Sequence, residues 1–145
     1  WGGVLAPGDY REFSQSNLTR LAQSIDRGPD QVPIIVFSRG ANGHLEALSQ
    51  IGADALGVDW TVGLGEARAR TGGRVALQGN LDPAAMYAAP ASLRQQVDMV
   101  LRDYGSGPGH VFNLGHGITP DVNPEQMHVL VDAVHELGKR RELLA

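Results

Sequence analysis

Five polar side chains stand at or just after the ends of apolar runs, the position in which parallel sheets carry their reactive groups. His116 lies between Gly115 and Gly117, directly after the apolar run at residues 110–114. An imidazole near neutral pH can donate or accept a hydrogen bond and can change its charge to suit an anionic partner. Flanking glycines let the backbone come close to a ligand. The alternative is a solvated loop side chain, and the local pattern favours a binding role.

The other four side chains are Arg39, Asp59, Gln78 and Asn80, and each has a structural alternative. Asp59 could act as a general acid or base, or could cap a helix or pair with an arginine. Arg39 could bind a carboxylate with two guanidinium nitrogens, or lie on the surface. Gln78 could point into a barrel, and Asn80 is most simply a turn former. We expect all four at the rim of one site, with structural roles favoured for Asp59 and Asn80.

Motifs for a metal, a dinucleotide or a covalent nucleophile are missing from the sequence. There is no cysteine, which excludes thiolate nucleophiles and Cys-based metal sites in this segment. The GLG at residues 63–65 lacks the third glycine of a dinucleotide fingerprint, because Arg68 stands in its place. His128 and His135 lie seven residues apart, too far along a helix to share one ion. We therefore predict no metal site.

Composition excludes two further classes of protein. The chain of 145 residues is 42% hydrophobic and 19% charged with a net charge of −4, which is typical of one globular domain. It has no block of basic residues, so nucleic-acid binding is not expected. It has no apolar run of the roughly 18–20 residues that a membrane-spanning helix needs, and no secretory signal. The first residue is Trp1 rather than Met, which suggests a segment of a longer protein.

Apolar runs and amphipathic stretches alternate along the chain. Short apolar runs predict strands at residues 32–37, 55–59, 74–78 and 110–114. Helical spacing predicts helices at residues 9–25, 44–51, 64–70 and around 93–101, and a last helix that Asn123 and Pro124 open. Four strand–helix units in a row predict a parallel sheet with right-handed crossovers. Both an open doubly wound sheet and half of a (β/α)8 barrel fit this order, and the polar strand ends favour the barrel only slightly.

Local patterns predict three further details. The run at residues 32–37 is apolar throughout, which is typical of a strand buried on both faces. Asp9 with Glu12 has the spacing of a capping box. Asp82, followed by Pro83, is the expected N-cap of the next helical segment.

Four segments in this order resemble uroporphyrinogen decarboxylases: VPIIVFSR at residues 32–39, GVDWTV at 57–62, LQGNLDP at 77–83 and FNLGHGI at 112–118. The opening WGGVL and the DYREF at residues 9–13 fit as well, so the resemblance covers essentially the whole chain. It implies an α/β fold: the C-terminal half, about four βα units, of a (β/α)8 TIM barrel. Residues 1–145 would be part of that single barrel domain, with its N-terminal part absent.

The resemblance also implies a reaction. Enzymes of this family remove the four acetate carboxylates of uroporphyrinogen III as CO2, without a cofactor, and give coproporphyrinogen III in haem biosynthesis. His116 matches the family's substrate-contacting histidine in NLGHG, so a tetrapyrrole is the implied ligand. The family's hydroxyl residue, arginine-rich loop, central aspartate and tyrosine would all precede Trp1. We therefore expect no activity from this segment alone, and a cytoplasmic homodimer for the full-length enzyme.

Two other interpretations stay open. The first is a methyltransferase of the same superfamily, which moves methyl groups between a corrinoid and a thiol. Those enzymes use zinc, typically with a cysteine where His116 stands, and the absence of cysteine argues against them. The second is a non-catalytic barrel segment, which would not bind a tetrapyrrole even with the missing half restored.

Overall fold

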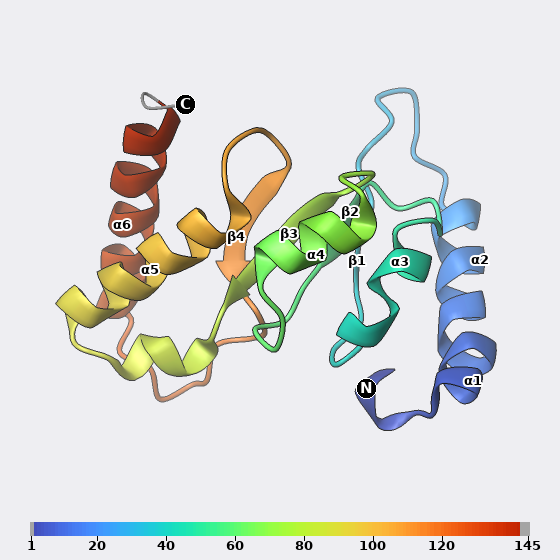
Figure 1. Cartoon of the computed structure of the whole chain (residues 1–145), viewed down its shortest axis with the longest axis horizontal. Helices are drawn as coiled ribbons and strands as arrows, with labels where there is room; N and C mark the ends of the chain where they lie inside the picture. Colours follow the sequence, from blue (N-terminus) through green and yellow to red (C-terminus); the bar gives the residue numbers. More distant parts are fainter. Residues whose placement is uncertain (1, 143–145) are drawn as a thin grey trace.

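The sheet consists of four parallel strands that pair in the order in which they occur in the chain. The computed structural model describes residues 2–142. Its strands are β1 (Ile35–Phe37), β2 (Ala55–Gly57), β3 (Ala76–Leu81) and β4 (His110–Leu114). The register places Val36 opposite Leu56 and Leu56 opposite Leu77, and the longest pairing joins β3 to β4. The carboxyl ends of all strands therefore meet at one edge of the sheet (Figure 1).

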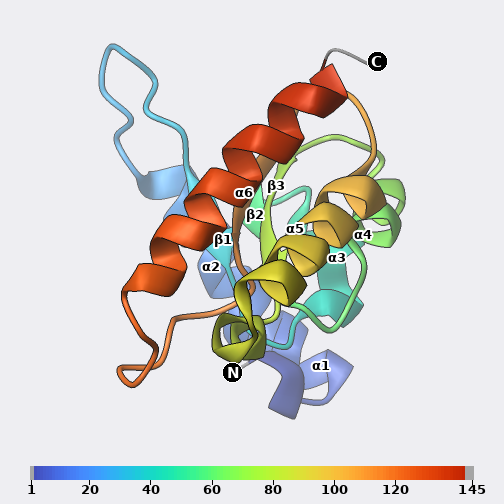
Figure 2. The same ribbon diagram turned by 90° about the vertical axis from the view of Figure 1, so that its left-hand side faces the viewer.

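Helical segments connect the strands. The α-helices are α1 (Pro7–Asp9), α2 (Ser16–Ser24), α3 (Leu45–Leu48), α4 (Leu64–Thr71), α5 (Pro90–Tyr104) and α6 (Glu125–Glu142). A π-helical stretch (Tyr10–Gln15) joins α1 to α2, and short 3-10 helices occur at Gly2–Val4, Asn42–His44 and Pro83–Tyr87, the last of which is η4. The long helices α5 and α6 pack side by side (Figure 2). Within residues 2–142, no helix is long and apolar enough to cross a membrane.

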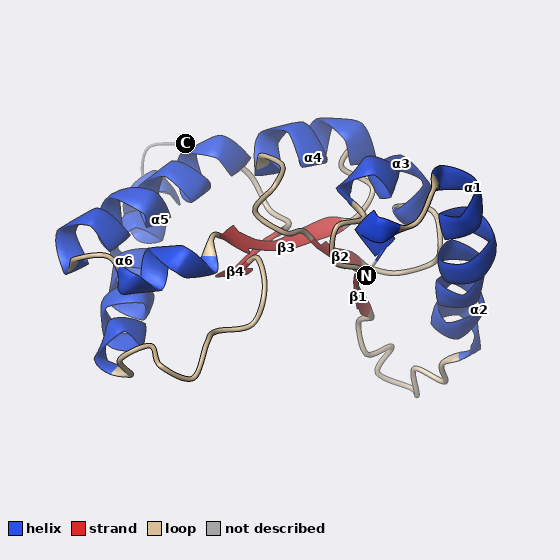
Figure 3. Ribbon diagram, turned by 90° about the horizontal axis from the view of Figure 1, so that it is seen from below, coloured by secondary structure: helices blue, strands red, loops and turns tan. Residues whose placement is uncertain are grey.

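The helices cover only one face of the sheet (Figure 3). An open doubly wound sheet has helices on both faces, and its strand order reverses at a switch point. Here the order is β1-β2-β3-β4 without a reversal, and the other face stays open. The fold is therefore half of a (β/α)8 barrel, as predicted, and the open side is the concave interior of that barrel.

The hydrophobic core lies between the sheet and the helices. One cluster of buried side chains joins Leu56 and Leu77 of the sheet to helices α3 and α4. A second joins the end of β3 to α5 and α6. The predicted apolar face of the last helix is confirmed, because all its members belong to the second cluster or pack against it: Val129, Leu130, Ala133, Val134 and Leu137. Each fully buried leucine contributes about 2 kcal/mol relative to an exposed one.

The first strand is shorter and more exposed than the sequence predicted. It covers Ile35–Phe37 only, and the side chains of Ile35 and Phe37 are 46% and 44% exposed. Burial on both faces was a wrong prediction, because helices cover only the face to which Val36 points. Ile35 and Phe37 point to the concave side instead. Phe37 is thereby available to line a site.

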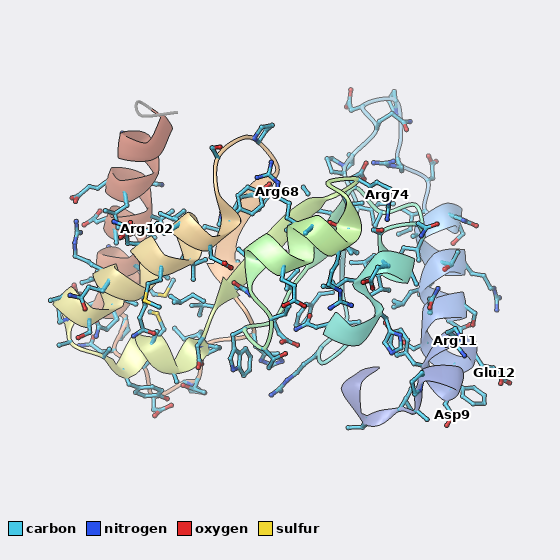
Figure 4. The ribbon with its side chains drawn as sticks, viewed as in Figure 1. Asp9, Arg11, Glu12, Arg68, Arg74 and Arg102 are labelled. Atoms are coloured by element: carbon cyan, nitrogen blue, oxygen red, sulfur yellow. The ribbon has the colours of Figure 1, made fainter. Side chains whose placement is uncertain are left out.

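Capping residues were predicted with mixed success. Asp82 accepts a hydrogen bond from the Ala84 amide at 2.9 Å, which confirms it as the N-cap of η4. The capping box at Asp9 was wrong, because the first helical segment already begins at Pro7 and Asp9 has helical backbone angles with no side-chain cap bond. Figure 4 shows Asp9, Arg11 and Glu12 on the outer side of this segment, where all three are exposed.

Candidate active site

The turn after β4 carries His116 at the carboxyl edge of the sheet. Its first residue, Gly115, is buried and donates its amide to the Leu81 carbonyl at 2.7 Å, which fixes the start of the turn beside β3. The next residue, His116, is exposed. Its ring lies 6.1 Å from the ring of Phe37, measured between centroids and tilted by 58°. A side chain from the end of β4 thus meets one from the end of β1 on the concave side.

Gly115 serves packing rather than ligand approach. A Cβ added there would lie 2.7 Å from the amide nitrogen of Trp60 and 3.0 Å from its ring carbon Cε3. No side chain larger than hydrogen fits without a shift of the turn after β2. Gly117 has no atom within 4 Å of an added Cβ, so only this second glycine borders open space. The two glycines predicted a close approach of the backbone to a ligand. At Gly115 the backbone instead lies close to Trp60.

A pocket of about 620 Å³ occupies the concave side of the sheet below this turn. Its lining combines the strand ends with the inner side of α6. The strand ends contribute Phe37, Gly57, Val58, Gln78, Asn113, Leu114 and His116, and α6 contributes Met127, Leu130, Val131, Val134 and His135. This is within the size range of ligand pockets, which are mostly apolar with a few polar groups that orient the ligand. Gln78 lies on the concave side, as predicted.

Asp59 lies at the same edge but is a buried scaffold residue, only 3% exposed. Its Oδ2 accepts the Gly40 amide at 2.8 Å, and its Oδ1 accepts the Asn42 side-chain amide at 2.7 Å. Oδ1 also accepts the Thr61 hydroxyl at 2.6 Å and the Thr61 amide at 3.0 Å. The carboxylate thus joins the loop after β1 to the turn after β2. The predicted helix-capping alternative was wrong, because Gly63 is the N-cap of α4.

The pKa of Asp59 reflects two opposed effects. Burial alone would raise the pKa of this carboxyl group. The hydrogen bonds from Thr61, Gly40 and Asn42 together outweigh burial and lower the pKa. Asp59 is therefore ionised at neutral pH, and its acceptor sites are taken up by the surrounding loops. This arrangement suits a structural anchor better than a general acid.

Asn80 is also buried and faces the loops rather than the pocket. Its side-chain amide donates to the carbonyl of Asp59 at 3.0 Å and to the carbonyl of Val62 at 2.6 Å. It therefore anchors the turn after β2 to β3. The structural alternative for Asn80 is favoured, although as a strand residue that holds the turn after β2 rather than as a turn former.

Arg39 lies at the rim beside Trp60. Its guanidinium carbon is 5.7 Å from the centre of the Trp60 ring, and Trp60 in turn packs against Gly115. A cation over an aromatic face is stabilised by the ring quadrupole. The contact places the positive charge of Arg39 beside Trp60, which packs against Gly115, the first residue of the His116 turn.

Sequence patterns missed several residues of the pocket, among them Phe37 and Asn113. Phe37 was assigned to the core, and Asn113 was passed over as a strand residue, although its alternation with apolar neighbours is a signal for the open face. His110 is the first residue of β4. Its ring stacks on Tyr104, the last residue of α5, with ring centroids 4.6 Å apart, and its Nε2 is 2.9 Å from the Gly79 carbonyl. Burial lowers its pKa, and the hydrogen bond partly opposes this.

Metal-ligating side chains do not gather anywhere in the described part of the chain. Within residues 2–142, no group of three or more His, Cys, Asp or Glu side chains is placed to hold a metal ion. The polar side chains that line the pocket are amides and imidazoles, which can bind a ligand through hydrogen bonds.

Known proteins are similar in sequence to this chain over almost its full length. Residues 1–137 match the family described as uroporphyrinogen decarboxylase (URO-D). The chain belongs to this family. A uroporphyrinogen decarboxylase from Hahella chejuensis is 53% identical over 140 residues, which cover 95% of this chain and 39% of the relative. Another from Xanthomonas campestris pv. campestris is 51% identical over 147 residues, which cover 97% and 42%. The chain spans about two-fifths of the length of these relatives.

A solved structure supports the fold. The chain is similar to a methyltransferase from Methanosarcina mazei, with a TM-score of 0.77 over 92% of this chain and 38% of that one. The two sequences are 21% identical, so this likeness concerns the fold alone. This chain and the methyltransferase thus share the arrangement of strands and helices that forms the half barrel.

Proposed function

We propose that these residues form the C-terminal half of a uroporphyrinogen decarboxylase. In the intact enzyme, the four acetate carboxylates of uroporphyrinogen III would leave as CO2 and give coproporphyrinogen III. The observation that carries this proposal is the exposed His116 of the NLGHG motif at a pocket of about 620 Å³. Membership of the family and two relatives of that name at 53% and 51% identity support it.

The pocket has the chemistry that a tetrapyrrole requires. The macrocycle has apolar ring carbons, polar N–H groups at its centre and carboxylates at its periphery. Phe37 and Ile118, both partly exposed, offer apolar surface to the ring, while Gln78, Asn113 and His116 offer hydrogen bonds. In this proposal, His116 binds and orients the substrate, because an imidazole can donate to a carboxylate or accept from a pyrrole N–H.

The bond-breaking step needs groups beyond those described here. Protonation of a pyrrole carbon makes a cationic ring that accepts the electron pair released as CO2 departs. Asp59 is a poor candidate for stabilising that cation, because Gly40, Asn42 and Thr61 occupy its carboxylate. We therefore assign the proton donor and the cation-stabilising group to the part of the intact enzyme outside these residues.

Arg39 extends the proposal to the substrate's side chains. Arginine pairs bidentately with carboxylates, and Arg39 lies at the rim over Trp60. We assign it to a peripheral carboxylate of the tetrapyrrole.

Turnover of uroporphyrinogen by the intact enzyme tests the proposal. His116→Ala should lower kcat/KM about tenfold or more, because it removes a hydrogen bond to a charged or polar substrate group. The matched control is His128→Ala, since His128 is exposed on α6 and does not line the pocket. Unchanged binding and rate in His116→Ala would contradict the role of His116. Absence of coproporphyrinogen formation by the unmodified enzyme would contradict the reaction itself.

The family resemblance further predicts a cytoplasmic homodimer. Light scattering of the intact enzyme measures its oligomeric state, and a monomer would contradict this part of the proposal.

A further inference from the structure

Tyr87 connects two turns at the carboxyl edge of the sheet. It is the last residue of η4, which follows β3, whereas Thr119 and Asp121 follow β4. The Tyr87 hydroxyl lies 2.8 Å and 2.9 Å from the two carboxylate oxygens of Asp121 and forms a hydrogen bond with the Thr119 hydroxyl. A phenol can donate one hydrogen bond and accept another, so Tyr87 can serve both partners at once.

These partners belong to the segment that carries His116. Residues 116–121 are all exposed and lie between buried Gly115 and buried Val122. Gly115 is tied to β3 through the Leu81 carbonyl, and Val122 packs in the second core cluster. An exposed segment of this kind gains order chiefly from the few bonds that reach it. Tyr87 supplies such bonds in the second half of this segment, at Thr119 and Asp121.

The backbone that presents Tyr87 is itself fixed on both sides. Met86, the residue before it, is 1% exposed in the second core cluster. The carbonyl of Ala88, the residue after it, accepts a hydrogen bond from the side-chain amide of Gln126 on α6 at 2.7 Å. Asp82 caps the start of the same 3-10 helix. The backbone at Tyr87 is therefore fixed on both sides, and the Tyr87 side chain extends from it to the exposed turn after β4.

We propose that Tyr87 is a positioning residue, which holds the His116 turn in one arrangement through Thr119 and Asp121. This inference rests on the proposed function of His116 as a substrate contact. Ordering a loop during binding costs free energy, whereas a loop that is ordered beforehand avoids that cost. Tyr87 acts through His116 and does not itself contact the substrate.

Two measurements on the intact enzyme test the proposal: steady-state kinetics, and amide hydrogen exchange of the peptide that covers residues 115–122. Tyr87→Phe removes only the hydroxyl. It should raise KM roughly threefold to tenfold, the range expected for one lost hydrogen bond, with little change in kcat. Exchange in the 115–122 peptide should become faster. Tyr104→Phe is the matched control, because its hydroxyl donates to the Pro108 carbonyl in the loop before β4. It should leave KM and this peptide unchanged.

Variants of Asp121 and a double variant separate positioning from direct contact. Asp121→Asn keeps an acceptor for the Tyr87 hydroxyl, so its KM should rise less than that of Asp121→Ala. In a His116→Ala background, Tyr87→Phe should have no further effect on KM, because residues that act through one another are not additive. An equal rise of KM in both backgrounds would overturn the proposal, and so would unchanged exchange in Tyr87→Phe. If His116→Ala alone changes nothing, the proposed role of His116 fails, while the exchange data still decide whether Tyr87 orders the turn.

Discussion

The turns after β2 and after β4 start at the same edge of the sheet and contact each other, yet they differ in how far their polar side chains are buried. Asp59, after β2, is 3% exposed, and its carboxylate is held by three residues of two loops. His116, after β4, is exposed over the pocket and touches the ring of Phe37. Gly115 and Trp60 form the contact between the two turns. A polar residue at a strand end is thus either buried among loops, as Asp59 is, or exposed at the pocket, as His116 is.

Asp59→Ala gives the largest effect expected from this comparison. It removes the acceptor for the Gly40 amide, the Asn42 side chain and Thr61, and leaves their donors poorly satisfied. The free energy of unfolding should fall by about 3–5 kcal/mol, as measured by urea titration. Asp59→Asn, which keeps one acceptor oxygen, should lose less. A loss below about 1 kcal/mol in Asp59→Ala would show that the carboxylate is not a scaffold.

Gly115→Ala should give the second largest effect. The added methyl group would lie 2.7 Å from the Trp60 amide nitrogen, so one of the two turns must shift. The expected loss is about 1–3 kcal/mol in thermal or chemical unfolding. Gly117→Ala is the control, because its added methyl group meets nothing within 4 Å. Equal effects at the two glycines would contradict the close contact between the turns.

A pH titration of stability tests the half-buried histidine of β4, His110. Burial lowers the pKa of His110 below its ordinary value of 6.5, so the unfolded chain binds the proton more readily than the folded one. This contribution is fully present above pH 6.5 and is lost as the pH falls from there through the folded-state pKa. Unfolding followed at several pH values should show the decrease, and His110→Gln should not. A decrease that persists in His110→Gln would place its origin elsewhere.

His116→Ala should have the smallest effect on stability. The side chain is exposed, and substitutions at such positions usually change the free energy of unfolding by less than about 0.5 kcal/mol. Urea unfolding of His116→Ala beside Asp59→Ala tests the contrast directly. Comparable losses of unfolding free energy in the two variants would mean that His116, like Asp59, stabilises the fold.

Local chemistry allowed much of the fold to be predicted. The run at residues 110–114 was predicted with the bounds of β4, and the last helix was predicted with its apolar face. Asp82 was predicted as a cap because its side chain needs only the amide two residues ahead. Predictions that depended on distant neighbours failed more often. The strand at residues 32–37 was assigned to a doubly buried position, which only the layer of helices could decide.

The sequence by itself determined the alternation of strands and helices, the family, and the presence of a histidine in a glycine-flanked turn at a strand end. These depend on periodicity, turn chemistry and motifs, which act within a few residues. The tertiary structure alone decided that Asp59 is buried beneath two loops, that Phe37 faces the pocket and that Tyr87 reaches Asp121, 34 residues away. Burial and hydrogen-bond partners come from segments far apart in the chain, so they emerge only when the sheet brings those segments together.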